Sequence, residues 1–158
     1  MTKADLPLDK FLIGTGLGAQ HAVDVARGVT RVALGDAGRQ RMLAARHVVE
    51  AALADSTAHY GINTGFGALA EVPIDPQNLR QLQLNLVRSH CTGVGTPLSR
   101  DIVRLVMLLR AQVLAAGHSG ARPVVVETLV AMLNAGVHPV IPCQGSVGAS
   151  GDLAPLAH

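Results

Sequence analysis

The sequence predicts a mainly α-helical protein with glycine-rich loops and a few very short strands. The 158 residues are 49% hydrophobic but only 2% aromatic, with no tryptophan. The core must therefore be built from Ala, Leu and Val, and Ala and Leu favour helix over strand. Most apolar residues also recur at helical spacing, in segments that glycine or proline separates.

The N-terminal part is predicted to contain a short strand, a glycine-rich turn and a helix. The strand covers residues 11–13, the helix covers about residues 20–26, and a second apolar run follows at residues 32–34. The turn fits the G-x-G-x-x-[G/A] spacing of a dinucleotide site, with a possible ribose-binding acid further on. These residues are Gly14, Gly16, Ala19 and Asp36. No further alternation of strand and helix follows, so we interpret the segment as a structural turn and keep nucleotide binding as an alternative.

Four longer segments have the apolar periodicity of helices. They cover about residues 36–55, 76–90, 100–116 and 124–134. Asp36 and Asp75 are expected to cap the first two, and Gly136 to end the last. The second has an apolar face made of Leu79, Leu82 and Leu86. The third is predicted to bury Ile102, Leu105, Val106, Leu109, Val113 and Leu114.

Charge and composition argue against several classes of protein. The 13 basic and 11 acidic residues give a net charge of +2, and no basic run suggests nucleic-acid binding. The most apolar stretch, residues 102–116, is too short to span a bilayer, and the N-terminus lacks the apolar region of a signal peptide. Cys91 and Cys143 lie far apart, without metal-ligand spacing. We expect a cytoplasmic protein with free thiols, no metal and no membrane segment.

The chemically most informative stretch is GSVGASGDLAPLAH, from Gly145 to His158. In it the amide nitrogen of Gly151 can approach the carbonyl carbon of Ala149, because glycine has no side chain to oppose a tight fold. Ring closure and loss of water, including the Ser150 hydroxyl, would leave an exocyclic methylene conjugated with carbonyl and imine groups. Such a group is an electrophile, which ordinary side chains do not supply. The structural alternative is a small-residue turn before a helix.

This stretch resembles the signature of the ammonia-lyases and aminomutases that form 4-methylidene-imidazol-5-one (MIO) from their own Ala-Ser-Gly. The resemblance implies that Ala149, Ser150 and Gly151 form MIO autocatalytically, without an external cofactor or metal. Tyr60 stands in a second motif of this family, Tyr-Gly-x-x-Thr-Gly-Phe-Gly, in which the tyrosine acts as the base. A phenolate suits this role, because removing a β-proton requires a stronger base than a carboxylate.

Ser89 and His90 indicate the substrate within this resemblance. Ser-His is the form typical of the histidine ammonia-lyases, whereas the tyrosine and phenylalanine enzymes resemble His-Leu and Phe-Leu at the pair. The resemblance therefore implies elimination of ammonia from L-histidine to give trans-urocanate, in histidine catabolism, by a homotetramer. The alternatives are a tyrosine or phenylalanine ammonia-lyase, an aminomutase, or a non-catalytic helical fragment that associates with itself.

The resemblance covers only the N-terminal part of family members, which are several times longer. Residues 1–158 are expected to form the MIO-bearing N-terminal domain, and the C-terminal helical-bundle domain has no counterpart. The side chains that bind the substrate carboxylate come later in the family. We therefore expect little or no turnover from this chain alone.

Overall fold

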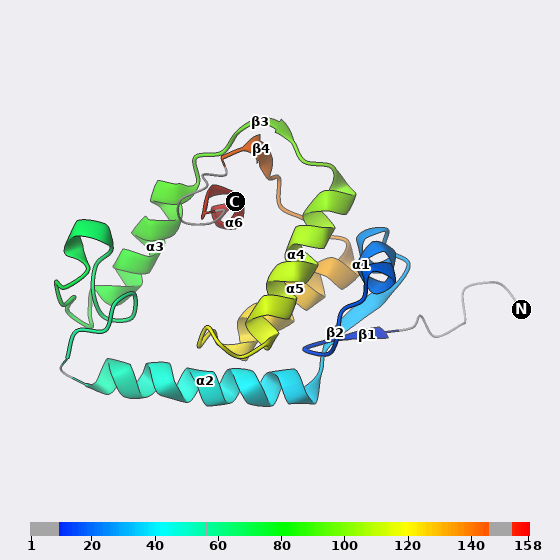
Figure 1. The fold of residues 1–158 in the computed structure, drawn as a ribbon. Helices are drawn as coiled ribbons and strands as arrows, with labels where there is room; N and C mark the ends of the chain where they lie inside the picture. Colours follow the sequence, from blue (N-terminus) through cyan, green and yellow to red (C-terminus); the bar gives the residue numbers. More distant parts are fainter. Residues whose placement is uncertain (1–9, 56, 146–152) are drawn as a thin grey trace, which may run out of the picture. The chain divides into compact units, whose positions relative to one another are not determined.

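The computed structural model describes residues 10–55, 57–145 and 153–158. These residues form two compact units, each built from two stretches of the chain. Unit 1 contains the described residues up to 46 together with 99–139, and unit 2 contains those of 47–98 and 140–158. Helices dominate both units (Figure 1), and the strands are only three or four residues long. The predicted fold class is confirmed.

Unit 1 begins with a parallel strand–helix–strand arrangement. β1 (Lys10–Ile13) pairs with β2 (Arg31–Leu34), and α1 (Ala19–Ala26) connects them. Phe11 lies opposite Val32 in this register. Phe11, Ile13 and Val32 are buried, because alternate residues of a strand point to the same face. The predicted strand and helix are confirmed, and the second apolar run forms β2.

A side chain completes the hydrogen bonding of β2. Asn134 Oδ1 accepts the Val32 N–H at 3.0 Å, and Asn134 Nδ2 donates to the Val32 carbonyl at 2.8 Å. Both backbone groups of Val32 would otherwise need a partner from another strand. The amide of Asn134 therefore takes the place of a third strand at this position.

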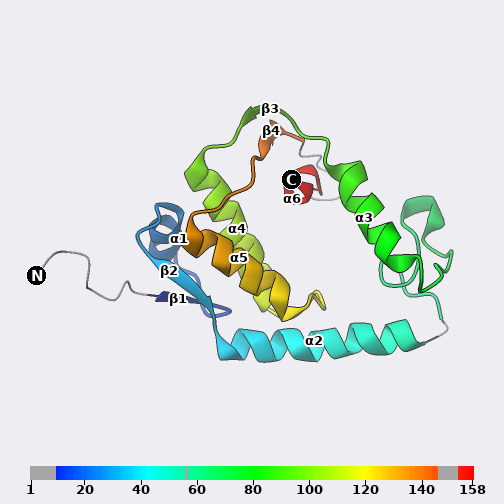
Figure 2. The ribbon, with the colours of Figure 1, turned by 180° about the vertical axis from the view of Figure 1, so that it is seen from behind.

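The helices of unit 1 pack around α4 (Arg100–Ala115), which contacts both α1 and α5 (Pro123–Ala135) (Figures 1 and 2). The buried face of α4 consists of Val103, Arg104, Met107, Leu108, Ala111, Leu114 and Ala115. The predicted face was therefore largely wrong: Leu114 is buried and Leu105 and Val106 are half-buried. Ile102 is 46% exposed and Val113 is 59% exposed. α4 is apolar on more than one side, so periodicity does not select the side that packs.

Arg104 is the buried charge of unit 1, with 3% of its surface exposed. Its Nε donates to the Val25 and Ala26 carbonyls at 3.0 Å, and its Nη1 donates to the Leu133 carbonyl at 2.8 Å. The last carbonyls of a helix have no partner within that helix, so one guanidinium caps the ends of both α1 and α5. Burial, and then the positive charge of Arg100, lower the pKa of Arg104.

α2 (Asp36–Ala54) begins in unit 1 and continues into unit 2. Asp36 was predicted to be the N-cap, but it is the first helical residue, and the Gly35 carbonyl accepts the Arg39 N–H. The carboxylate still lies in the first turn, where the helix dipole favours it. α5 ends as predicted at Gly136, which has φ +70°, a left-handed conformation that glycine adopts without steric cost.

Unit 2 contains the rest of α2, a short 3₁₀ helix η1 (Gly67–Leu69) and α3 (Leu79–His90). α3 begins at Leu79 rather than at the predicted Pro76. Asp75 does not cap it, because Asp75 Oδ1 accepts the Gln77 N–H at 2.8 Å and forms a turn of its own. The predicted apolar face of α3 is the less exposed one, with Leu79, Leu82 and Leu86 half-buried.

The remaining elements of unit 2 are β3 (Val94–Pro97), β4 (Pro142–Gln144) and α6 (Leu153–Ala157). β3 and β4 pair antiparallel, with Val94 opposite Gln144 and an irregularity in the register before Pro97. This pairing was not predicted, because short strands with proline and glycine carry no alternating pattern. Across the described ranges, no helix is long and apolar enough to cross a membrane.

Candidate functional site

Three predicted site residues, Tyr60, Ser89 and His90, lie in unit 2. The three predicted MIO-forming residues Ala149, Ser150 and Gly151 lie outside the described residues. The structure therefore describes the surroundings of Tyr60, Ser89 and His90, and the residues on both sides of 146–152.

Tyr60 stands in a tight turn that follows α2. Gly61, with φ +74°, donates its N–H to Thr64 Oγ1 at 3.2 Å, and Thr64 Oγ1 donates to the Gly65 carbonyl at 3.0 Å. Thr64 is 1% exposed, so the turn closes on a buried hydroxyl. The Tyr60 and Phe66 rings pack in an edge-to-face arrangement at a centroid distance of 6.0 Å. Tyr60 is nevertheless 65% exposed, so the turn presents the phenol to its surroundings.

A polar cluster made of Asp55, Thr57, His59 and Asn63 surrounds Tyr60 in the sequence. Asp55 Oδ2 accepts the Thr57 hydroxyl at 2.6 Å and lies 3.2 Å from His59 Nε2. These contacts, with the Thr57 hydrogen bonds the largest cause, lower the pKa of Asp55 to about 2. Sequence reasoning missed the cluster, although Asp-x-Thr is a spacing that favours a side-chain-to-backbone turn.

Ser89 and His90 occupy the last turn of α3. Ser89 Oγ donates to the Leu86 carbonyl at 2.9 Å, and His90 Nδ1 lies 2.8 Å from the same oxygen. A carbonyl only accepts, so Nδ1 carries the ring proton, and Nε2 of a neutral His90 is an acceptor. The pair thus presents a hydroxyl and an imidazole side by side, 3.0 Å apart at Oγ and Nδ1.

His158 links the end of α6 to the segment that follows α3. Its Nε2 accepts the Gly93 N–H at 3.0 Å, and its Nδ1 lies 3.3 Å from Cys91 Sγ. Because Nε2 accepts, Nδ1 carries the proton and directs it at the sulfur. The last residue of the Gly145–His158 stretch is thereby held beside the residues that follow Ser89 and His90. Sequence reasoning missed this contact, since His158 has no recognisable spacing to Cys91.

The described residues on the two sides of residues 146–152 lie close together. A Cβ added to Gly145 would stand 3.0 Å from the Ala154 Cβ and 3.1 Å from the Gly93 Cα. Only glycine allows this approach without displacement. Gly145 and Ala154 are thus neighbours in space although they flank residues 146–152 in the sequence.

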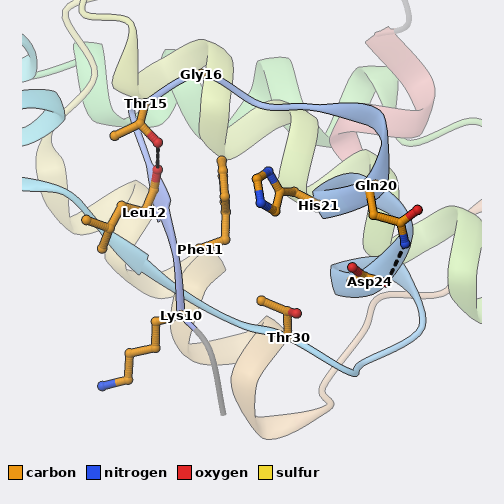
Figure 3. Close-up of a pocket in the computed structure, with 9 residues that line it drawn as sticks. All are labelled: Lys10, Phe11, Leu12, Thr15, Gly16, Gln20, His21, Asp24 and Thr30. Atoms are coloured by element: carbon orange, nitrogen blue, oxygen red, sulfur yellow. Dashed lines mark hydrogen bonds between the residues drawn. The ribbon is translucent and has the colours of Figure 1, made fainter. Parts of the chain in front are cut away.

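Unit 1 contains a separate pocket of about 490 Å³ (Figure 3). The Phe11 and His21 rings lie side by side in it, with their centroids 5.2 Å apart, and Gln20 donates to Asp24 at 2.9 Å. The residues of the glycine-rich turn that line this pocket are Thr15 and Gly16.

The glycine-rich turn of unit 1 uses its backbone groups within the protein. The Gly14 N–H donates to Gln112 Oε1 at 3.0 Å, and the Gly14 carbonyl accepts from Arg41 Nη2 at 2.6 Å. A Cβ on Gly14 would lie 2.9 Å from the Gly38 Cα, so this glycine allows close packing on α2. The geometry favours the structural interpretation of the turn over a phosphate-binding one.

Cys91 and Cys143 are exposed free thiols. Within the part of the chain that the structure covers, no three His, Cys, Asp or Glu side chains gather in a way that could hold a metal ion.

Curated relatives of this chain are histidine ammonia-lyases. The protein from Anaeromyxobacter dehalogenans is 55% identical over 148 residues, which cover 94% of this chain and 29% of the relative. The protein from Deinococcus radiodurans is 50% identical over 148 residues, which cover 94% of this chain and 28% of the relative. The chain therefore spans less than a third of the length of these relatives.

Similar solved structures include other enzymes as well. Histidine ammonia-lyase from Trypanosoma cruzi has a TM-score of 0.84 at 39% identity, over 96% of this chain and 28% of its own. Ergothionase from Treponema denticola has a TM-score of 0.89 at 30% identity, over 95% of this chain and 30% of its own. Tyrosine aminomutase from Streptomyces globisporus has a TM-score of 0.84 at 33% identity, over 97% of this chain and 28% of its own.

The sequence profile of the family described as "Aromatic amino acid lyase" matches residues 17–158. This range includes the motifs around Tyr60 and around Ser150 on which the resemblance rests. Since the match covers nearly the whole sequence, the chain belongs to the aromatic amino acid lyase family.

Proposed function

We propose that this chain is the N-terminal, MIO-bearing domain of a histidine ammonia-lyase, which eliminates ammonia from L-histidine to give trans-urocanate. The Ser89–His90 pair at the end of α3 carries the choice of substrate. The relatives at 50–55% identity support it, because they are histidine ammonia-lyases. The similarity to a tyrosine aminomutase is weaker, at 33% identity.

Tyr60 is the proposed base that takes the β-proton of the substrate. Its exposed ring stands on a turn whose shape depends on Thr64 and Phe66 of the same motif. The turn fixes the backbone of Tyr60 while the phenol oxygen stays accessible, which a general base requires.

Ser89 and His90 are proposed to bind the imidazole ring of the substrate. His90 Nδ1 is directed at the Leu86 carbonyl, so Nε2 is the acceptor that a substrate ring N–H can meet. Ser89 Oγ lies 3.0 Å from His90 Nδ1 and donates to the Leu86 carbonyl, so its oxygen is available as a further acceptor. A site with polar groups for the substrate ring disfavours a phenyl ring, which would leave these groups unpaired.

Ala149, Ser150 and Gly151 are the proposed source of MIO. The approach of Gly145 to Ala154 and Gly93 supports this, because it holds the two flanks of residues 146–152 together. A short segment whose flanks lie close together suits the tight backbone fold that ring closure needs. When present, MIO supplies an electrophilic methylene for the substrate amino group, so that ammonia becomes a better leaving group.

We further propose that the complete enzyme is a cytoplasmic homotetramer and that residues beyond those matched here bind the substrate carboxylate. The chain covers 28–29% of its relatives, so most of their sequence has no counterpart in it. Little or no turnover is therefore expected from the 158 residues alone.

The intact mass of the purified chain tests the proposal. MIO formation lowers the mass by two water molecules relative to the encoded sequence. Ser150→Ala should remove this deficit, whereas Ser146→Ala, a serine of the same glycine-rich stretch, should retain it. For turnover, the chain is co-expressed with the remaining part of the Anaeromyxobacter relative, and urocanate is followed by its absorbance.

L-Tyrosine and L-phenylalanine are assayed in parallel. Faster product formation from either one than from L-histidine would favour the lyases or aminomutases of the other substrates. An unmodified mass together with no product from any of the three, also after co-expression, would refute the catalytic proposal and favour the self-associating fragment.

A further inference from the structure

The Asp55 carboxylate organises the three residues before Tyr60. Its Oδ1 accepts the Thr57 N–H at 3.2 Å, and its Oδ2 accepts the Thr57 hydroxyl at 2.6 Å. His59 Nε2 approaches the same Oδ2 at 3.2 Å and Thr57 Oγ1 at 2.9 Å. One carboxylate thus binds the backbone of Thr57, its side chain and the ring of His59.

The protons in this cluster can be assigned from the acceptors. The Thr57 hydroxyl proton points at Asp55, so Thr57 Oγ1 is an acceptor toward His59, and the carboxylate oxygen is an acceptor as well. His59 Nε2 must therefore carry a proton, in the neutral ring or in the imidazolium. Asp55 stays an acceptor at ordinary pH, because its contacts lower its pKa to about 2.

Asn63 closes the turn from the other side of Tyr60. Its Oδ1 accepts the His59 N–H at 2.7 Å, and its Nδ2 donates to the Thr57 carbonyl at 2.9 Å. The Ile62 and Asn63 N–H groups donate to the His59 carbonyl at 3.0 and 3.2 Å. The backbone on both sides of Tyr60 is therefore bonded to His59 or Thr57.

We propose that Asp55 and His59 are positioning residues for Tyr60. Tyr60 is 65% exposed, and its ring contacts the ring of Phe66. The direction of the phenol is then set by the backbone of the turn, which the Asp55–Thr57–His59 bonds hold at its start. That the direction of the Tyr60 phenol matters for catalysis rests on the proposed function. That Asp55 and His59 set this direction does not.

The fluorescence of Tyr60 can test this proposal without an added label. It has one tyrosine and no tryptophan, so tyrosine fluorescence of the 158-residue chain reports on Tyr60 alone. Asp55→Ala and His59→Ala are each expected to raise the amplitude of the nanosecond component of the anisotropy decay about twofold, because the turn loses its anchor. Far-UV circular dichroism should show unchanged helix content in both.

Matched controls separate positioning from general loosening. Asp75→Ala removes another exposed aspartate that accepts a backbone N–H two residues on. His47→Ala removes another exposed histidine beside a carboxylate, at 3.6 Å from Glu50. Both should leave the decay as in the parent chain. His59→Gln retains a side-chain N–H donor and should restore most of the parent behaviour.

An unchanged anisotropy decay in Asp55→Ala and His59→Ala overturns the proposal, and so does an equal change in the two controls.

If an alanine variant loses helix, Thr57→Val and Thr57→Ser decide instead. Valine keeps the shape but not the hydroxyl, and serine keeps the hydroxyl. A decay that changes in valine and not in serine supports the proposal, and any other pattern refutes it. Turnover does not enter this experiment, so failure of the catalytic proposal would leave its result intact.

Discussion

Replacing Arg104 with methionine is expected to destabilise unit 1 by about 3 kcal/mol. Methionine retains the length and most of the apolar volume of the side chain, so the cost comes from hydrogen bonding rather than from a cavity. The guanidinium is 3% exposed and serves the carbonyls of Val25, Ala26 and Leu133. Lysine should be nearly as harmful, because one ammonium lacks the planar fork that reaches three acceptors.

The size of this destabilisation follows from the hydrogen bonds that Arg104 makes to the three carbonyls. A hydrogen bond from a charged donor contributes about 1.5–3 kcal/mol, so three such acceptors set an upper range of about 5–9 kcal/mol. Two of them retain a backbone partner, since Gly28 and Gly136 donate to Val25 and Leu133. Methionine also removes the cost of burying a charge, which offsets several kcal/mol. The remainder is about 3 kcal/mol.

Urea unfolding followed by circular dichroism measures this change. With a slope of about 1–3 kcal/mol per molar urea, the midpoint should fall by about 1–3 M. Arg100→Met is the matched control, because Arg100 is an exposed arginine of the same helix that donates to His138. Its effect should stay within about 0.5 kcal/mol. Equal midpoints for the Arg104 variant and the parent chain would refute the capping role.

Three further predictions concern the site and the pH dependence. Gly93→Ala should break the link to His158, because the new Cβ would stand 2.9 Å from the ring nitrogen; the ¹⁵N shift of His158 Nε2 reports the loss. Tyr60→Phe should lower urocanate formation in the co-expressed enzyme by about 10²–10⁴-fold while the mass deficit of two waters persists. Burial, and then the charge of Arg100, lower the pKa of His138 below 6.5 in the folded chain. Below pH 6.5 the unfolded chain therefore binds this proton more readily than the folded chain. The free energy of unfolding should fall as the pH falls through this range. Replacing His138 with glutamine should flatten that slope in urea titrations at several pH values.

The positions of the helices and strands could be predicted from the sequence better than the faces that they bury. Local signals such as Gly136 at a helix end act over a few residues, so they can be recognised in the sequence directly. The buried side of α4 depends on which neighbours pack there, and Arg104 is buried only because three distant carbonyls receive it. No local pattern distinguishes such an arginine from an exposed one.

The site shows the same division. Tyr60 and the Ser89–His90 pair could be proposed from the sequence because they stand in motifs of contiguous residues. The Cys91–His158 contact and the approach of Gly145 to Gly93 join residues far apart in the sequence. The approach of Gly145 to Gly93 adjoins the pairing of β3 with β4, and short, proline-containing strands carry no pattern that predicts such a pairing.

The bond between Asn134 and Val32 has a consequence for biosynthesis. It joins residues 102 positions apart, so the edge of β2 stays incomplete until Asn134 has left the ribosome. At about 5–20 residues per second, this delay amounts to about 5–20 seconds. The intervening segment, which contains Tyr60 and the Ser89–His90 pair, is synthesised during that time, before Val32 of β2 gains its hydrogen bonds from Asn134.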